Sequence, residues 1–220
     1  MSLRGFLSKV EPEGIPFPLS RVYSLVTLSG IIKDFYSTVA NQVLGHLGSG
    51  RVLDVGTGPG RLPLIIASKN KYIRVTGVDL SPDMVKIASK KAAKKGLENL
   101  DFKVGNASSL PFREGEFDLV ISTLSFHHWK GPEAALEEIH RVLREGGEAW
   151  IFDMPRRMDA ETLNYLKQRY GFMASYFLYL HGFTEPFYDE ISLKEIAESS
   201  SFNRYELNYK GLAYRLKLFK

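Results

Sequence analysis

Hydrophobic and polar positions follow two different periods along the chain. Residues 19–47 carry apolar side chains at helical spacing, and Gly30 separates two predicted helices in this stretch. From residue 50 onward, short runs rich in Val, Ile and Leu alternate with amphipathic stretches of helical period. The runs are RVLDVG, YIRVTGVD, LDFKVG, FDLVIS and EAWIFD, and helices are expected near 60–69, 82–95 and 132–143.

Strands that are apolar throughout are buried on both faces, which requires a parallel sheet covered by helices on each side. After residue 155 come a long aromatic helical stretch, a helix near 192–200 and the alternating segment RYELNYKGLAYRLKLFK. A turn at Lys210 and Gly211 would make this last segment a hairpin. The pattern therefore predicts an α/β fold, doubly wound, with a mostly parallel seven-stranded sheet, helices on both faces and an antiparallel C-terminal hairpin.

Composition excludes several classes of protein. The content of 44% hydrophobic and 25% charged residues is that of an ordinary globular chain. The absence of cysteine excludes a disulfide scaffold, a zinc ribbon and a thiol nucleophile, and no metal site is predicted. The net charge of +4 permits anionic partners without requiring nucleic acid. Since no signal-peptide core and no spanning run of about 20 apolar residues is visible, we expect a soluble, cytoplasmic protein.

The segment VLDVGTGPG joins a predicted strand to a helix through Gly56, Gly58 and Gly60. A dinucleotide site would need a further glycine at the position of Arg61, and a P-loop would need a G-K-[ST] ending. Neither is present. Asp54 would repel a pyrophosphate but suits a ligand that carries an ammonium group. A glycine-rich loop also occurs as a tight turn without a ligand, so the loop alone does not decide the function.

Asp79 ends the second predicted strand, about 20 residues beyond the glycine loop, where an acidic side chain can accept both ribose hydroxyls of a nucleoside. The alternative is an N-cap of the following helix. Ser81 already suits that position, and Pro82 follows it at the first helical residue. We therefore predict that Asp79 binds ribose.

Five segments in this order, VLDVGTGPG, VTGVDLS, GNASSLPF, FDLVIS and LREGGEAWIFD, resemble the motifs of class I S-adenosylmethionine-dependent methyltransferases. The resemblance covers residues 50–153. It implies S-adenosylmethionine as cofactor and S-adenosylhomocysteine as product, with the loop of residues 54–60 against the methionine part and Asp79 on the ribose. The cofactor-binding residues that it implies are Asp54, Gly56, Thr57, Gly58, Gly60, Asp79, Leu80, Met84, Asn106, Ala107, Ser122 and Thr123.

The resemblance also assigns the adenine end of the cofactor. It places Leu80 beside the adenine and the pair Asn106-Ala107 at its amino edge, where Asp-Ala is commoner. The amide oxygen of Asn106 can still accept a hydrogen bond from the exocyclic amine. Met84 would pack on the adenine face, although simple packing of a helix against the sheet explains it equally well.

The methyl acceptor is expected to approach over STLSFHHWKGP, after the fourth strand. By the resemblance, Ser122 and Thr123 border the methionine part. His127 is a candidate general base, because a neutral imidazole can take a proton from a phenol, an enol or an activated carbon acid. Alternatively, His127 and His128 only shape the pocket. Adjacent histidines are expected to face different ways, so that at most one reaches the acceptor, and Trp129 is expected to anchor the loop.

Missing motifs and aromatic residues narrow the choice of acceptor. The chain lacks the Asn/Asp-Pro-Pro-aromatic turn of methyltransferases that act on exocyclic base amines, and it lacks the thiol that attacks pyrimidine C5. Aromatic side chains are dense in residues 163–188, which favours a flat or apolar acceptor. They are Tyr165, Tyr170, Phe172, Tyr176, Phe177, Tyr179, Phe183, Phe187 and Tyr188, with Tyr23 and Tyr36 nearer the N-terminus.

The sequence thus predicts one methyltransferase domain over residues 1–220. We expect an N-terminal helical cover (1–47), a cofactor-binding core (50–153), a helical lid (156–190) and a helix with a closing hairpin (191–220). The chain resembles the small single-domain group that includes ubiquinone/menaquinone-biosynthesis C-methyltransferases, which implies a small aromatic or lipophilic acceptor. An RNA or protein methyltransferase and a non-catalytic S-adenosylmethionine-binding protein remain open alternatives, and nothing indicates an oligomeric state.

Overall fold

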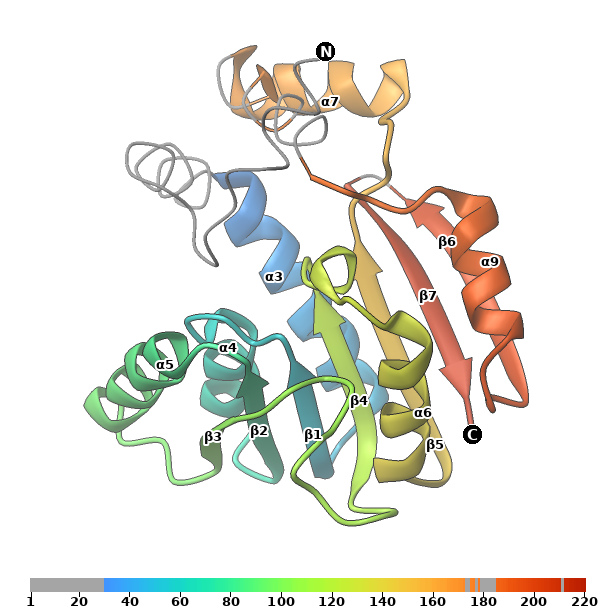
Figure 1. Ribbon diagram of the computed structural model, residues 1–220. Helices are drawn as coiled ribbons and strands as arrows, with labels where there is room; N and C mark the ends of the chain where they lie inside the picture. The colour runs from blue at the N-terminus through green and yellow to red at the C-terminus, as the bar shows by residue number, and fades with distance from the viewer. Residues whose placement is uncertain (1–29, 173–174, 177, 179–184, 211) are drawn as a thin grey trace.

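The computed structural model describes residues 30–172, 175–176, 178, 185–210 and 212–220. Its centre is a seven-stranded sheet in the order β3-β2-β1-β4-β5-β7-β6 (Figure 1). Strands β1 to β5 pair in parallel, whereas β7 runs antiparallel to both β5 and β6. The strands are β1 (Gly50–Val55), β2 (Ile73–Asp79), β3 (Leu100–Val104), β4 (Phe117–Thr123), β5 (Leu143–Asp153), β6 (Arg204–Lys210) and β7 (Ala213–Phe219). The predicted fold class is confirmed.

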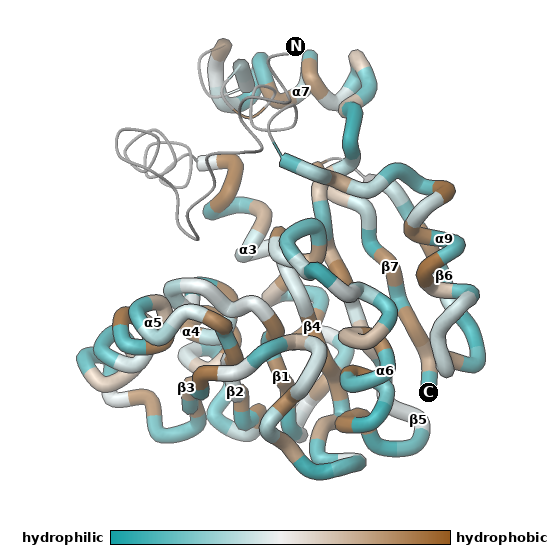
Figure 2. Tube along the Cα trace, in the orientation of Figure 1, coloured by the Kyte–Doolittle hydropathy of each residue, from teal (hydrophilic) through white to brown (hydrophobic). Residues whose placement is uncertain are grey.

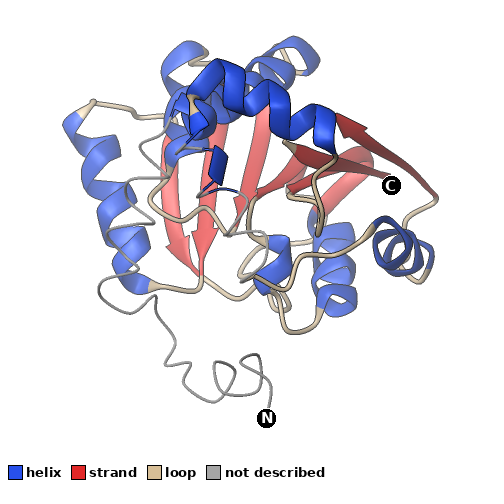
Figure 3. Ribbon diagram, turned by 90° about the horizontal axis from the view of Figure 1, so that it is seen from above, coloured by secondary structure: helices blue, strands red, loops and turns tan. Residues whose placement is uncertain are grey.

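Helices cover both faces of this sheet, as Figure 3 shows from above. Their starts follow local sequence signals: the Ser81 hydroxyl accepts from the Met84 amide, and the Asp159 and Asp189 carboxylates cap two later helices in the same way. The helices are α3 (Gly30–His46), α4 (Arg61–Lys69), α5 (Pro82–Lys94), the 3₁₀ helix η1 (Phe126–His128), α6 (Pro132–Val142), α7 (Ala160–Tyr170) and α9 (Glu190–Glu198).

Alternate residues of the central strands supply two separate hydrophobic cores. In β4, Leu119 and Ile121 belong to the core that includes the buried side chains of α3 and α4, whereas Val120 between them belongs to the core that includes those of α6 and α9. Figure 2 accordingly shows hydrophobic colour along the inner strands and hydrophilic colour on the lower loops. Burial of both faces explains the continuous apolar runs in the sequence, since neither face is left for polar side chains.

Strand β5 is longer than its apolar pattern indicates. It begins at Leu143, directly after α6, whereas the run EAWIFD predicted a start near residue 148. Leu143 pairs with Phe117 and Glu148 pairs with Leu119, so residues 144–147 fall in a register shift between the two strands, which a strictly alternating pattern does not reveal.

Two expectations near the N-terminus lie outside the described residues. The helix expected before Gly30 and the residue Tyr23 both fall in residues 1–29. Among the helices that are described, none is long and apolar enough to cross a membrane.

Candidate functional site

The carboxyl ends of β1 and β4 mark the point where the strand order reverses. Strand β1 pairs with β2 on one side and with β4 on the other, so the following loops diverge to opposite faces. In open α/β sheets the crevice at such a point binds ligands. Figure 1 shows these ends below α7, near η1 and the N-terminal part of α3.

The three glycines of the loop after β1 all have positive φ but differ in their surroundings. A Cβ on Gly56 would overlap the side chain of Ser125, so this glycine permits the loops after β1 and β4 to touch. A Cβ on Gly60 would lie 2.7 Å from Phe102 and 2.9 Å from Ala88, which makes this residue a packing position. A Cβ on Gly58 would meet no atom of the described residues within 4 Å, so Gly58 alone of these three glycines borders open space in the described part of the chain.

Asp79 fixes the glycine loop to the end of β2. One of its carboxylate oxygens accepts from the Gly58 amide at 2.6 Å, and the other accepts from the Ser81 amide at 2.9 Å. Each carboxylate oxygen can accept a further hydrogen bond. Asp79 is therefore oriented by the backbone and can still receive two hydroxyl donors.

Several buried polar atoms at this edge of the sheet make no hydrogen bond within the described part of the chain. Buried polar groups are almost always paired in native proteins, so such a group indicates a partner that binds from outside. All of them lie at or just beyond the carboxyl ends of β1 and β4. They are both carboxylate oxygens of Asp54, the hydroxyls of Thr57 and Ser122, and Nε2 of His127.

Asp54 is 1% exposed near the end of β1. Burial raises the pKa of its carboxyl to about 7, and the negative charge of Asp79 adds to the rise, whereas the neighbouring Thr57 hydroxyl opposes it. An unpaired buried carboxylate is unfavourable in the folded chain. A cationic ligand group beside Asp54 would favour the ionised form and remove that penalty.

His127 is held by Asp153 at the end of β5. The Asp153 carboxylate accepts from Nδ1–H of the imidazole at 2.8 Å and from the backbone amide of His127 at 2.8 Å. Because a carboxylate only accepts, this contact places the ring proton on Nδ1 and leaves the lone pair on Nε2. The sequence did not single out Asp153, because its contact with His127 depends on the pairing of β5 with β4.

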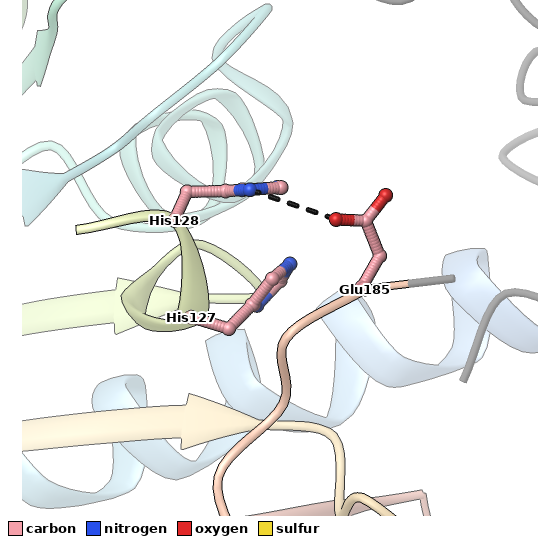
Figure 4. Close-up of side chains that lie close together, drawn as sticks. All are labelled: His127, His128 and Glu185. Atoms are coloured by element: carbon pink, nitrogen blue, oxygen red, sulfur yellow. Dashed lines mark ion pairs between the residues drawn. The ribbon is translucent and has the colours of Figure 1, made fainter. Parts of the chain in front are cut away.

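The expectation that the two adjacent histidines face different ways is wrong. Their ring centroids lie 3.9 Å apart, although successive residues of a 3₁₀ helix such as η1 project about 120° apart around its axis. They differ instead in burial, since His127 is 5% exposed and His128 lies at the surface. Glu185, also missed in the sequence, approaches both rings (Figure 4).

Trp129 anchors the loop, as predicted. Its ring packs edge-on against Phe126 with a centroid distance of 5.0 Å, and its indole N–H donates to the Ser125 hydroxyl at 3.2 Å. Leu124, between β4 and this turn, has a φ of 53°. A non-glycine residue in the left-handed region is strained, and such strain is frequent at functional sites.

Comparison with known proteins agrees with this geometry. Residues 53–151 match the methyltransferase-domain family. A SAM-dependent methyltransferase from Aquifex aeolicus has the same fold, with a TM-score of 0.65 and 21% identity over 93% of this chain and 99% of that one. The core of this chain is a class I S-adenosylmethionine-dependent methyltransferase domain. Phosphoethanolamine N-methyltransferase 2 of Haemonchus contortus, solved with S-adenosyl-L-methionine, also shares the fold (TM-score 0.60, 18% identity, 83% of this chain and 51% of that one).

Among curated proteins, the methyltransferase core is similar to two bacterial enzymes. It is 38% identical over 105 residues to the demethylmenaquinone methyltransferase of Thermus thermophilus, and these residues make up 48% of this chain and 47% of that protein. It is 38% identical over 104 residues to the uncharacterized methyltransferase YcgJ of Bacillus subtilis, and these residues make up 47% of this chain and 40% of that protein. The chain thus spans less than half the length of these relatives.

Four apolar side chains that follow the end of β2, lie in α5 or end β3 are exposed. Leu80 is 67% exposed, and Met84, Ile87 and Val104 are also exposed. Two of them, Leu80 and Val104, adjoin the ribose-binding candidate Asp79 in the chain and in the sheet, where a flat ligand ring could cover them. Met84 is 37% exposed, so its side chain is not fully buried between α5 and the sheet, and its contact with adenine stays a prediction.

Asn106 and Ala107 follow β3 at the same edge. The side-chain oxygen of Asn106 accepts from the Ser108 amide at 3.0 Å, and its carbonyl accepts from the Ser109 amide. Ala107 packs against the core under α6. One lone pair of the Asn106 amide oxygen is thus already engaged within its own turn, which the sequence did not predict.

The residues of the methyltransferase domain fit S-adenosylmethionine. The unpaired carboxylate of Asp54 matches an ammonium group, Asp79 matches two ribose hydroxyls, and the open space at Gly58 admits a ligand close to the backbone. Bound S-adenosylmethionine supplies a methyl group on a positively charged sulfur. Ser122 and Thr123 are buried at the end of β4, beside the strand that carries Asp54.

Helices α3 and α7 meet above the site. Asp34 of α3 accepts from the Tyr170 hydroxyl at 2.7 Å and from Arg169 at 3.0 Å, and these donors lower the pKa of Asp34. Tyr36 packs against the core between α3 and the sheet, which favours a structural role. Of the aromatic candidates, Phe177, Tyr179 and Phe183 lie outside the described residues.

Proposed function

We propose that this chain transfers the methyl group of S-adenosylmethionine to a small aromatic or lipophilic acceptor. The observation that carries the proposal is the group of unpaired buried polar atoms at the ends of β1 and β4. Each buried polar group that lacks a hydrogen-bond partner lowers the stability of the folded chain by about 1–3 kcal/mol. Their retention is explained if a ligand with matching groups binds there.

His127 is the candidate proton acceptor for an acceptor that must lose a proton. Asp153 holds its imidazole in the tautomer with the lone pair on Nε2, and Phe187 packs on the ring at a centroid distance of 4.2 Å. A positioned base of this kind contributes about 10²–10⁴-fold to a rate. The same arrangement excludes water from Nε2, because the side chain is almost fully buried.

Apolar side chains above the site favour an aromatic or lipophilic acceptor. A third hydrophobic cluster joins α3, α7 and the segment before α9, and Leu124, Met154 and Phe187 belong to it or pack against it. We propose that these elements cover the acceptor. The name of the Thermus thermophilus relative points to a quinone substrate in that protein, which is an acceptor of this chemical class.

Asp79 is expected to dominate the affinity for the cofactor. Titration calorimetry with S-adenosylmethionine should show saturable binding to the wild type and an affinity at least tenfold lower for Asp79→Ala, because hydrogen bonds to a charged group contribute about 1.5–3 kcal/mol each. Asp101→Ala is the control. Asp101 lies near the amino end of β3, whereas Asp79 lies at the carboxyl end of β2, so this variant should bind normally. Unchanged affinity in Asp79→Ala would rule out the ribose assignment.

The acceptor class is testable with a panel of quinones, phenols and small amines and a methyl-labelled donor. We expect label in a phenol or quinone. Label in RNA or protein alone would show that the proposed acceptor class is wrong. Saturable cofactor binding without transfer to any acceptor would favour the non-catalytic alternative.

A further inference from the structure

Two histidines and a glutamate from distant parts of the chain converge beside the candidate active site. His127 and His128 lie in η1, and Glu185 lies in the segment that leads to α9 (Figure 4). Each offers one nitrogen or carboxylate oxygen, and these three atoms lie within 4.8 Å of one another. The burial of the three residues grades from buried His127 through half-buried Glu185 to exposed His128.

His127 has the environment of a metal-bound histidine. Nearly all such histidines donate their other ring N–H to a carboxylate or carbonyl, which fixes the ring and raises the basicity of the binding nitrogen. Asp153 fulfils this role through Nδ1–H and through the backbone amide of His127. The amide of Met154 donates to the same carboxylate at 2.9 Å and fixes it in turn.

The second observation is Nε2 of His127. This nitrogen is buried, has no hydrogen-bond partner within the described residues, and belongs to a side chain that is only 2% exposed. Figure 4 shows the ring directed toward the space between His128 and Glu185. A buried imidazole that is oriented by a carboxylate and leaves its lone pair unpaired indicates a ligand at that lone pair.

The other two residues can complete such a site. Nδ1 of His128 lies 3.8 Å from a carboxylate oxygen of Glu185, which is longer than a hydrogen bond. Two ligands at about 2.1 Å on a tetrahedral ion lie about 3.4 Å apart, so only small side-chain movements are needed. The exposed His128 and the half-buried Glu185 can make these movements, whereas His127 is held in place.

We propose that His127, His128 and Glu185 bind a divalent transition-metal ion, of which Zn²⁺ is the best match. Two imidazoles and one carboxylate suit Zn²⁺ or Fe²⁺ and disfavour Mg²⁺, which prefers oxygen ligands. Three protein ligands leave a coordination position open, as in catalytic zinc sites. That position would take an oxygen atom of the methyl acceptor, a role that rests on the proposed function, whereas binding of the ion does not.

The ion would change the role of His127. With the metal bound, Nε2 is a ligand and no longer accepts a proton. An acceptor hydroxyl on the ion would instead release its proton to solvent, since coordination lowers the pKa of a bound hydroxyl or water. The proposed acceptor class then becomes narrower: it is an aromatic or lipophilic molecule with an oxygen atom next to the methylated position.

The test is titration of the untagged, chelator-treated chain with Zn²⁺ by calorimetry, repeated with Co²⁺ to record visible absorption. We expect one ion per chain with micromolar or tighter affinity. His128→Ala and Glu185→Gln, which alter partly exposed side chains, should each weaken binding at least tenfold, and Asp153→Asn should weaken it about 10–100-fold as a positioning residue. His140→Ala, on α6, is the control and should bind Zn²⁺ normally.

The outcomes separate this inference from the proposed function. Titration with S-adenosylmethionine verifies that each variant is folded and binds cofactor. Zn²⁺ binding that is absent, or equal in wild type, His128→Ala and Glu185→Gln, overturns the metal site, and transfer to a phenol by the chelated enzyme would then leave the proposed function intact. Zn²⁺ binding that depends on the three residues supports the metal site even if no acceptor in the panel is methylated.

Discussion

Asp54→Asn is expected to make the folded chain more stable while weakening its affinity for the cofactor. Burial raises the pKa of Asp54 from 3.8 to about 7. Between these pH values the unfolded chain is ionised at this residue and the folded chain is protonated, so the folded state loses stability as the pH rises. Above about pH 7 the loss is on the order of 4 kcal/mol, and asparagine avoids it because it has no proton to release.

Urea unfolding followed by circular dichroism measures this effect. At about pH 8 the variant should exceed the wild type by about 1–3 kcal/mol, since the unpaired amide of asparagine offsets part of the gain. The difference should shrink toward about pH 5, where folded Asp54 is neutral. Asp101→Asn, an exposed carboxylate on β3, should follow the wild type at every pH.

The same residue predicts how cofactor binding depends on pH. An ammonium group requires ionised Asp54, so the wild-type affinity for S-adenosylmethionine should fall by up to about tenfold per pH unit below pH 7. Asp54→Asn should bind at least tenfold more weakly at about pH 8 and should lack this dependence. A variant with unchanged affinity and an unchanged pH profile of stability would contradict the assignment of Asp54.

Of the single alanine substitutions in the glycine loop, Gly56→Ala should lower the stability of the folded chain most. The residue has a φ of 72°, and its Cβ would overlap the Ser125 side chain, so the loops after β1 and β4 would have to separate. The left-handed backbone contributes about 1–2 kcal/mol of destabilisation and the overlap about 1–3 kcal/mol. We expect a lower midpoint of urea unfolding and loss of measurable cofactor binding.

Two further variants separate the clash from backbone strain. Gly58 also has positive φ, but a Cβ there would meet no atom of the described residues within 4 Å. Gly58→Ala should therefore lose little more than the strain energy, while its methyl group projects into the proposed cofactor space. Ser125→Gly in the Gly56→Ala background should restore part of the stability, although it removes the hydrogen bond from Trp129. Equal stability of Gly56→Ala and Gly58→Ala would refute the contact between the loops.

The sequence predicted those elements whose structure is determined by residues close together in the chain. The strands β1, β2 and β4 were visible because both of their faces are buried, and the glycine loop because its backbone conformation needs residues without Cβ. The start of β5 was missed, since its residues before Gly147 are polar and join the sheet through an irregular register.

The cluster around His127 could not be derived in the same way. His127 and His128 were recognised as candidates, but Asp153 meets His127 only because β5 lies beside β4, with Phe152 paired to Thr123. Glu185 comes from the segment before α9, far from the two histidines in the sequence. Contacts of this kind depend on tertiary register, for which the local pattern carries no signal.

The candidate site can form only after β1 has paired with β4. The backbone amide of Arg51 donates to Asp118 across 67 residues of sequence, at the start of these two strands. Non-local pairings of this kind form slowly, and a chain without them has no site at all. A cofactor that binds only the finished site adds about 2.7 kcal/mol of stability at a hundredfold excess over its dissociation constant. The concentration of S-adenosylmethionine during synthesis would therefore influence how many new chains escape proteolysis, independently of any methyl group transferred.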